Sequence, residues 1–179
     1  KGVIVDIDSV SDAVRSCVQK LKALTNISIE SAYVNVMGLH VDLFYFKSSV
    51  DVLRQDHEIT SGDIERVLKK VEDVKLPEDL RIIDIVPRQY IVDGCDGIID
   101  PLGMAGVKLE VESDVVVGKI TTFNNIVKSL EKANVTIDGF IAEALALGET
   151  ALTFDEKEMG AVLIDIGGGV TNVSVFKNK

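Results

Sequence analysis

The sequence is short of several residue types, and each shortage excludes a class of protein. It contains no tryptophan, two cysteines and three prolines in 179 residues. The cysteines, Cys17 and Cys95, have no CxxC partner, so a disulfide framework and a structural zinc site both lack support, and a reducing, cytoplasmic compartment is expected. No apolar run approaches the roughly 18 residues that cross a bilayer, so no membrane-spanning segment is predicted.

Basic residues are also scarce, which bears on possible partners. The 19 Lys and Arg are outnumbered by 29 Asp and Glu, giving a formal net charge of −10 and a pI near 4.7. Phosphate backbones repel acidic proteins, so we expect no nucleic-acid partner. With 46% hydrophobic and 27% charged residues, the composition is that of an ordinary globular protein. The length suits one core or two small ones.

The spacing of apolar residues predicts an α/β scaffold that carries an inserted α+β block from about 38 to 118. Before the block, the scaffold has a strand at the start of the chain, then a helix capped by Asp8 or Ser9 with Cys17 on its buried face, then a second strand. After the block we expect a helix from about 121, a strand at 137–142, a second helix at about 143–152 and a hairpin at 160–179.

The inserted block has its own order of elements. We expect a hairpin that turns near 47–49, and then a helix from Thr60, where Asp63 completes a capping box. An extended segment, a loop rich in Gly, Asp and Pro and a final strand follow, at 81–94, 94–106 and 107–118. The aromatic residues Phe44, Tyr45 and Phe46 lie in the hairpin. We expect at least two of them in the core of the block, with Tyr45 facing outward.

The chemistry-bearing motif is the final stretch, "AVLIDIGGGVTNVSVFKNK". Gly167, Gly168 and Gly169 permit positive φ angles and let an anion approach the backbone amides. Asp165 ends the preceding strand, where its carboxylate suits a water of a bound Mg²⁺, and Thr171 adds a hydroxyl. Neither GxxxxGK[ST] nor GxGxxG occurs. On the glycines alone, a plain turn between two strands is the commoner explanation.

The surrounding residues favour the phosphate-binding interpretation. The stretch "LIDIGGGVTNVSVF" resembles the second phosphate loop of the actin-like ATPases, a superfamily that includes actin, heat-shock ATPases and sugar kinases. Further blocks, among them "RIIDIVPRQYIVDG" and "GIIDPLGMAGVKLEVE", resemble the bacterial cell-division FtsA family from the first residue to the last. The "DPLGMAGVKLEV" block is far more specific than the glycine loop.

This resemblance implies a partial actin-like (ribonuclease-H-like) lobe with an inserted α+β subdomain. Residues 1–37 and 119–159 resemble the two pieces of subdomain 1A, residues 38–118 the inserted 1C (SHS2) subdomain, and residues 160–179 the first hairpin of subdomain 2A. In this scheme the first phosphate loop precedes residue 1. The adenosine-binding segment, the FtsZ-binding subdomain and an amphipathic membrane helix follow residue 179, so we expect a fragment.

The resemblance also implies a function. The full-length protein is expected to bind ATP and Mg²⁺, to polymerise, and to tether FtsZ filaments to the inner face of the cell membrane at the division site. The 1C subdomain is expected to self-associate and to contact later division proteins, whereas FtsZ and the membrane are contacted only through segments outside this chain. A nucleotide gripped from two lobes needs donors from both, so residues 1–179 alone should bind ATP weakly or not at all and show no activity. The alternatives are a related pilus-assembly adaptor and a sugar-kinase-type phosphotransferase.

The same resemblance assigns roles to individual residues. Asp165, Gly167–Gly169 and Thr171 are expected to bind the nucleotide, with Asp165 holding Mg²⁺ through water. Glu143 matches an acid near the attacking water, or it is simply a helix-start acid favoured by the helix dipole. Val170 and Asn172 replace a usual hydroxyl residue and a usual aspartate, which puts efficient hydrolysis in doubt. His40 and His57 stand alone, so no metal site is expected there.

Overall fold

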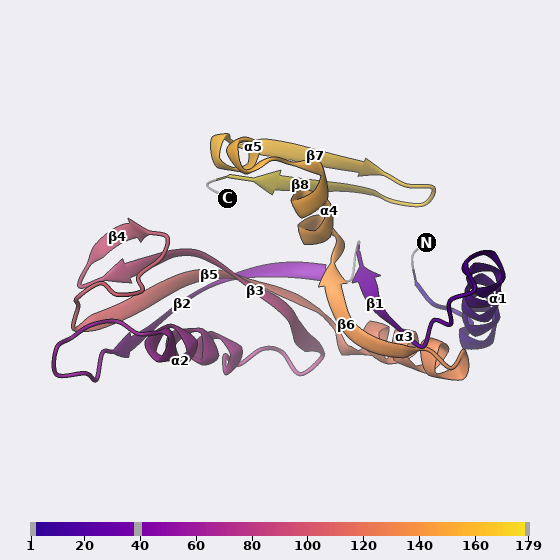
Figure 1. Cartoon of the computed structure of the whole chain (residues 1–179), viewed down its shortest axis with the longest axis horizontal. Coiled ribbons are helices and arrows are strands. Elements are labelled where there is room, and N and C mark those ends of the chain that lie inside the picture. The colour runs from indigo at the N-terminus through magenta and orange to yellow at the C-terminus, as the bar shows by residue number, and fades with distance from the viewer. Residues whose placement is uncertain (1–2, 38–40, 178–179) are drawn as a thin grey trace. The chain divides into compact units, whose positions relative to one another are not determined.

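The computed structural model describes residues 3–37 and 41–177, which form two compact units (Figure 1). The first unit comprises residues 1–41 and 118–177, and the second comprises residues 42–117. No helix in the described ranges is both long enough and apolar enough to cross a membrane.

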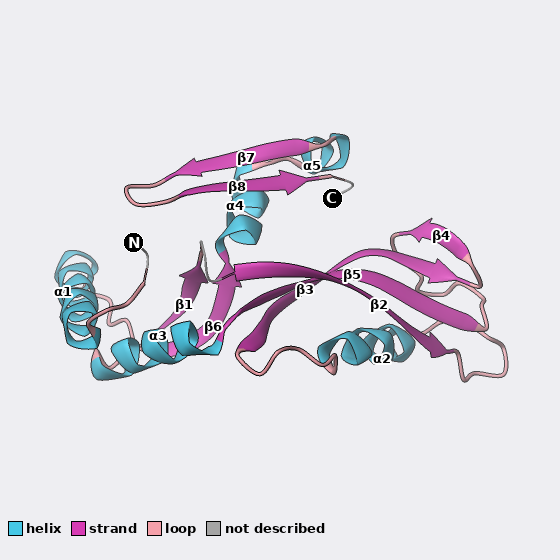
Figure 2. Ribbon diagram, turned by 180° about the vertical axis from the view of Figure 1, so that it is seen from behind, coloured by secondary structure: helices cyan, strands magenta, loops and turns pink. Residues whose placement is uncertain are grey.

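The second unit is built on a four-stranded sheet in the order β2-β5-β3-β4. Its strands are β2 (Val41–Asp51), β3 (Leu80–Val92), β4 (Cys95–Ile98) and β5 (Lys108–Lys119). Helix α2 (Ser61–Glu72) covers one face of this sheet (Figure 2). The core lies between them and includes Val67 and Val71 of α2 and Leu109, Val111, Val115 and Val117 of β5. Alternate residues of β5 therefore face the helix, as one buried face of a strand requires.

Helix α2 begins as its sequence predicts. The Asp63 carboxylate accepts hydrogen bonds from the Thr60 N–H at 2.9 Å and from the Thr60 hydroxyl at 2.6 Å. The Thr60 side chain in turn accepts from the Asp63 N–H, which completes the capping box. Arg66 also pairs with Asp63, one turn further along the helix.

Two expectations for this unit are wrong. The hairpin turning near 47–49 is absent, because β2 runs unbroken through Lys47, Ser48 and Ser49. None of these three residues favours the positive φ of a tight turn, and a neighbouring strand, β5, accompanies β2. The tight turn instead lies where the expected loop begins, at Asp93 and Gly94, whose φ angles of 48° and 87° suit a two-residue hairpin between β3 and β4.

The aromatic residues of β2 also depart from expectation. Only Phe46 packs against the core, whereas Phe44 and Tyr45 are exposed, so the expectation of two buried rings is wrong. Tyr45 does face outward, with 53% of its surface exposed. The guanidinium of Arg88 lies 5.5 Å from the centre of its ring. Tyr45 is thus part of a polar surface on the sheet.

The first unit contains a parallel pair of strands, β1 (Ser31–Val36) and β6 (Thr136–Ala142). Helices α1 (Ile7–Thr25) and α3 (Ile120–Lys132) contact each other, and Arg15 of α1 donates a hydrogen bond to the Lys132 carbonyl of α3 at 2.8 Å. A small core joins these elements and consists of Leu130, Ala133 and Val135 with Val14, Val18, Ala32, Val34, Ile126 and Ile137 around them.

The start of the chain differs from the sequence-based prediction. Residues 3–6 form no strand, and residues 1–2 lie outside the described ranges. Asp6 caps α1 by accepting from the Asp8 N–H at 2.9 Å and the Ser9 N–H at 3.2 Å, so the helix begins two residues earlier than predicted. Cys17 is exposed, which corrects its assignment to the core.

Two short helices and a hairpin complete the first unit. These are α4 (Glu143–Ala151), α5 (Phe154–Met159), β7 (Ala161–Ile166) and β8 (Thr171–Phe176). The hairpin strands are antiparallel, with Leu163 opposite Ser174 and Asp165 opposite Asn172. One face of the hairpin packs toward α4, whereas the other exposes Val162, Ile164, Ile166, Val173 and Val175.

Candidate functional site

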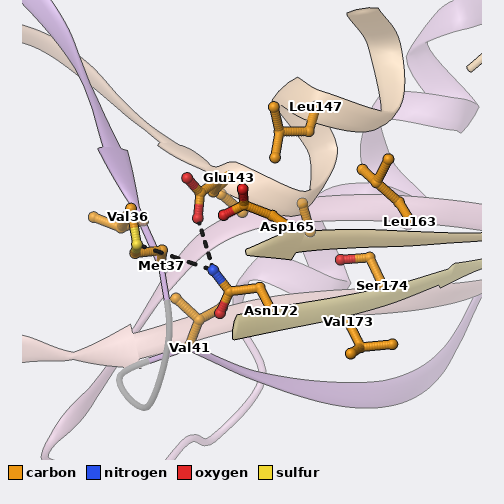
Figure 3. Close-up of a pocket in the computed structure, with 12 residues that line it drawn as sticks. Val36, Met37, Val41, Glu143, Leu147, Leu163, Asp165, Asn172, Val173 and Ser174 are labelled. Atoms are coloured by element: carbon orange, nitrogen blue, oxygen red, sulfur yellow. Dashed lines mark hydrogen bonds between the residues drawn. The ribbon is translucent and has the colours of Figure 1, made fainter. Parts of the chain in front are cut away.

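The candidate site is a cavity of about 180 Å³ in the first unit, at the ends of β1 and β6 (Figure 3). Its wall includes Val36 and Met37 at the end of β1, Glu143 at the start of α4, and the inward-facing residues of the hairpin. Those inward-facing residues are Leu163 and Asp165 of β7 and Asn172 and Ser174 of β8. They share a face because side chains alternate along each strand.

Three polar side chains converge in this cavity. Asn172 donates a hydrogen bond from Nδ2 to Oε2 of Glu143 at 3.1 Å, and Met37 Sδ lies 4.0 Å from the same nitrogen (Figure 3). Asp165 lies opposite Asn172 in the hairpin register, and its carboxylate lies beside that of Glu143. The start of α4 is therefore joined to the hairpin by the hydrogen bond from Asn172 to Glu143.

The electrostatics of the cavity are acidic. Burial raises the pKa of Glu143, and the neighbouring Asp165 carboxylate raises it further. The described residues that line the cavity include no Lys, Arg or His. No group of three or more His, Cys, Asp or Glu side chains that could hold a metal ion occurs within 3–37 and 41–177. The carboxylates of Glu143 and Asp165 suit a hydrated divalent cation, held partly through water, better than a bare anion.

The glycine loop follows β7 directly and is open to solvent. Gly167, Gly168 and Gly169 are all exposed, and the Gly167 N–H donates to the Val170 carbonyl at 3.0 Å. The positive φ that these glycines permit is not used, since the described glycines with positive φ are Gly94, Gly97, Gly103 and Gly160. The backbone at Gly168 is instead surrounded by open space, because a Cβ built on Gly168 would meet no atom within 4 Å.

The geometry brings together some of the predicted residues and leaves others apart. Glu143 and Asp165 share the cavity, whereas the three glycines and the exposed Thr171 lie beside it and do not line it. His57 is exposed, and His40 lies outside the described residues.

Comparisons with known proteins find similarity to FtsA proteins along nearly the whole chain. A family model described as the SHS2 domain inserted in FtsA matches residues 38–117, close to the second unit at 42–117. The cell division protein FtsA of Bacillus subtilis is 37% identical over 178 residues, which cover 99% of this chain and 40% of that protein. FtsA of Pseudomonas aeruginosa is 35% identical over 176 residues, covering 98% of this chain and 42% of that protein.

The chain therefore resembles a fragment of FtsA. It spans about 40% of the length of these FtsA relatives. A solved chain of the PilM–PilN type IV pilus biogenesis complex superposes with a TM-score of 0.62 over 99% of this chain and 47% of that one, at 13% identity. At that identity the likeness shows the fold alone. The predicted partial actin-like α/β fold with an inserted α+β domain is thereby confirmed.

Sequence reasoning missed part of the site in this FtsA-like chain. Asn172 was identified only as a departure from the usual aspartate, and Met37 and Leu147 were not singled out. Strand alternation was the available signal for Asn172. A hairpin that places Asp165 inward also places the residue opposite it inward.

Proposed function

We propose that this chain is the part of an FtsA-family cell-division scaffold that supplies one side of a Mg-ATP site. The observation that carries the proposal is the position of Asp165, in an acid-lined cavity at the strand end that leads directly into an exposed glycine loop. Backbone amides of Gly167–Gly169 would hold phosphate oxygens, with the Thr171 hydroxyl just beyond them. Asp165 would hold Mg²⁺ through a water molecule.

The negative charges of the cavity should make nucleotide binding depend on magnesium. Glu143 and Asp165 would repel the phosphates of a free nucleotide, and no cationic side chain among the described lining residues offsets them. Bound Mg²⁺ would supply the missing positive charge. We therefore expect Mg-ATP to bind and magnesium-free ATP to bind much more weakly.

Glu143 is the candidate acid near the attacking water, and its surroundings favour slow turnover. One of its carboxylate oxygens already accepts a hydrogen bond from Asn172 at 3.1 Å. The other oxygen is left to accept a proton from water, whereas Asn172 carries an amide that cannot take a proton where an aspartate is usual. The proposal is therefore an adaptor that binds nucleotide, and efficient hydrolysis is not expected.

In the whole protein, nucleotide binding would go together with assembly into polymers. We propose that the FtsA-length protein polymerises, tethers FtsZ filaments to the inner face of the membrane and contacts later division proteins. Residues 42–117 would provide the contacts with neighbouring protomers and with later proteins. FtsZ and the membrane would be reached through parts of the family's length that this chain does not span, and the other side of the nucleotide site would come from there too.

Calorimetry on an FtsA-length protein that contains this sequence tests the nucleotide proposal. Gly168→Val should abolish Mg-ATP binding, because the added side chain fills open space in the fold but occupies the approach to the amides. Gly62→Val, at the exposed start of α2, is the matched control and should bind normally. Unchanged binding by Gly168→Val, or equal binding with and without magnesium, would contradict the proposal.

A second candidate is a pilus-assembly adaptor, because the PilM chain shares the fold over nearly the whole length. The much higher identity to FtsA proteins favours the first candidate. Co-sedimentation of the FtsA-length protein with FtsZ filaments separates the two. Pelleting with FtsZ is expected of the scaffold, and its absence favours the pilus adaptor.

A further inference from the structure

The stretch DPLGMAGVKLEV, residues 100–111, is the most family-specific part of the sequence, and it does not contribute to the proposed nucleotide site. It carries exposed apolar side chains that the nucleotide proposal does not explain. We define the docking platform as residues 52–59 and 99–107, which lie at one end of the second unit. Five large apolar side chains on it are between 38% and 78% exposed: Leu53, Ile99, Leu102, Met104 and Val107. None of them contributes to the core of the unit. Exposed apolar side chains gathered on one feature mark interaction surfaces.

The platform is held firmly. Four backbone hydrogen bonds of 2.8–2.9 Å tie its two segments together, Val52 to Val107, Ile59 to Met104, Gly103 to Ile59 and Gly106 to His57. Gly106 is buried, and a Cβ on it would lie 2.3 Å from a methyl carbon of Val92, so the loop approaches β3 as closely as a backbone can. The apolar side chains are thus exposed on a fixed backbone and cannot fold away from water. A partner would not have to order this loop on binding.

The charges around the platform restrict the partner. Residues 51–59 and 93–107 carry six carboxylates and a single arginine, and that arginine, Arg54, is already paired with Asp56 at 2.6 Å. The six acids, all exposed, are Asp51, Asp56, Glu58, Asp93, Asp96 and Asp100. Such a surface repels anionic lipid, nucleic acid and a second copy of itself. It attracts a segment that carries Lys or Arg beside apolar side chains.

We propose that the docking platform binds a cationic, apolar-anchored segment of another protein. The apolar anchors would cover Leu102, Met104 and Val107, and the basic residues of the segment would face the surrounding carboxylates. This inference rests on the proposed partner-binding role of residues 42–117 and names the surface and the chemistry of that partner. It does not depend on nucleotide.

Selection from a library of random short peptides tests the proposal. Peptides are selected on the full chain and counter-selected on the same chain carrying Leu102→Ser and Val107→Ser. The enriched peptides should combine Lys or Arg with large apolar residues. For one such peptide, the double variant should bind about tenfold more weakly. Glu58→Gln with Asp96→Asn should weaken binding at low salt, and this effect should fade in 1 M salt, where the Debye length falls to about 3 Å.

Matched controls separate the platform from the rest of the unit. Leu43→Ser removes an equally exposed apolar side chain from β2, and Glu65→Gln removes an exposed carboxylate from α2. Both should leave peptide binding unchanged. Circular dichroism of every variant should match that of the wild-type chain, because the changed side chains are exposed.

Several results would overturn the proposal. These are enriched peptides that are acidic or uncharged, peptides that bind the Leu102→Ser, Val107→Ser variant equally well, or no enrichment over that variant. Anionic phosphatidylglycerol vesicles bound through Leu102 and Val107 would identify a lipid surface instead. Loss of self-association in the double variant would identify a contact between copies. Self-association through residues 42–117 is tested separately at the exposed ring of Tyr45 on β2. If Tyr45→Ser leaves self-association intact while peptide binding holds, that self-contact fails and the docking proposal stands.

Discussion

A methyl group at Gly148 tests how α4 packs on the hairpin that carries Asp165. Gly148 is buried in α4, and a Cβ built there would lie 2.4 Å from Cζ and 2.5 Å from Cε1 of Phe176. Ordinary carbon contacts lie at about 3.5–4.0 Å, so the ring of Phe176 must move by more than an ångström to admit the methyl group. The substitution Gly148→Ala therefore forces β8 or its ring away from the helix that begins at Glu143.

Two opposing effects set the size of the change. Alanine is favoured over glycine in a helix interior by about 1 kcal/mol. Overpacking a fitted contact costs about 1–3 kcal/mol. Since the contact is far inside the normal distance, we expect overpacking to win, with a net loss of about 1 kcal/mol and a melting temperature lower by about 3 °C. Urea and thermal unfolding measure both quantities.

The same substitution in a variant that lacks the Phe176 ring tests whether the clash causes the loss of stability. In a Phe176→Leu chain the clashing ring atoms are gone, so Gly148→Ala should now stabilise by up to about 1 kcal/mol through helix propensity. The sign of the effect should therefore reverse between the two backgrounds. If Gly148→Ala stabilises the wild-type chain as well, Phe176 does not pack on α4 as described.

Three further changes test other parts of the account. Glu143→Gln should stabilise the fold at pH 7 by up to about 1 kcal/mol, since the raised pKa of Glu143 means that its ionised form opposes folding, and partial solvation limits the effect. This gain, measured by urea unfolding across pH, should vanish below pH 4.5, and a constant gain would contradict it. Asp63→Ala should cost about 1 kcal/mol through loss of the capping box. Burial acts to raise the pKa of Asp63, but hydrogen bonds, first from Thr60, outweigh it and lower the pKa. The loss of stability in Asp63→Ala should therefore be full at neutral pH and shrink below pH 3.8. Equal losses of stability at neutral and acidic pH would refute this. Tyr45→Ser should weaken self-association in analytical ultracentrifugation with little change in melting temperature, because the ring is exposed, and an unfolded variant would show the assignment to be wrong.

Much of the fold could be predicted where local signals were strong. Helix α2 has a capping box at Thr60 and a clear apolar stripe, and β5 alternates between buried and half-buried residues from Leu109 to Val115. The Asp93–Gly94 turn was missed because its glycines and acids suit a long loop equally well. The length of β2 was missed because apolar patterning blurs around 47–49, and only its neighbour in the sheet, β5, shows that the strand continues.

The candidate site was predictable in its acids but not in its contacts. Asp165 and Glu143 were singled out from motifs whose residues adjoin in the sequence. The contact between Asn172 and Met37 joins residues 135 positions apart, and no local pattern reports such a meeting. The conformation of the glycine loop could not be predicted from the sequence, because glycine permits positive φ without requiring it.

A crystal structure of an FtsA-length protein containing this sequence, grown with Mg-ATP, tests the central claim most directly. The account predicts phosphate oxygens within about 3 Å of the backbone nitrogens of the Gly167–Gly169 loop, and the Asp165 carboxylate in contact with the magnesium's water shell. A nucleotide bound elsewhere, with this loop facing empty solvent, would contradict it.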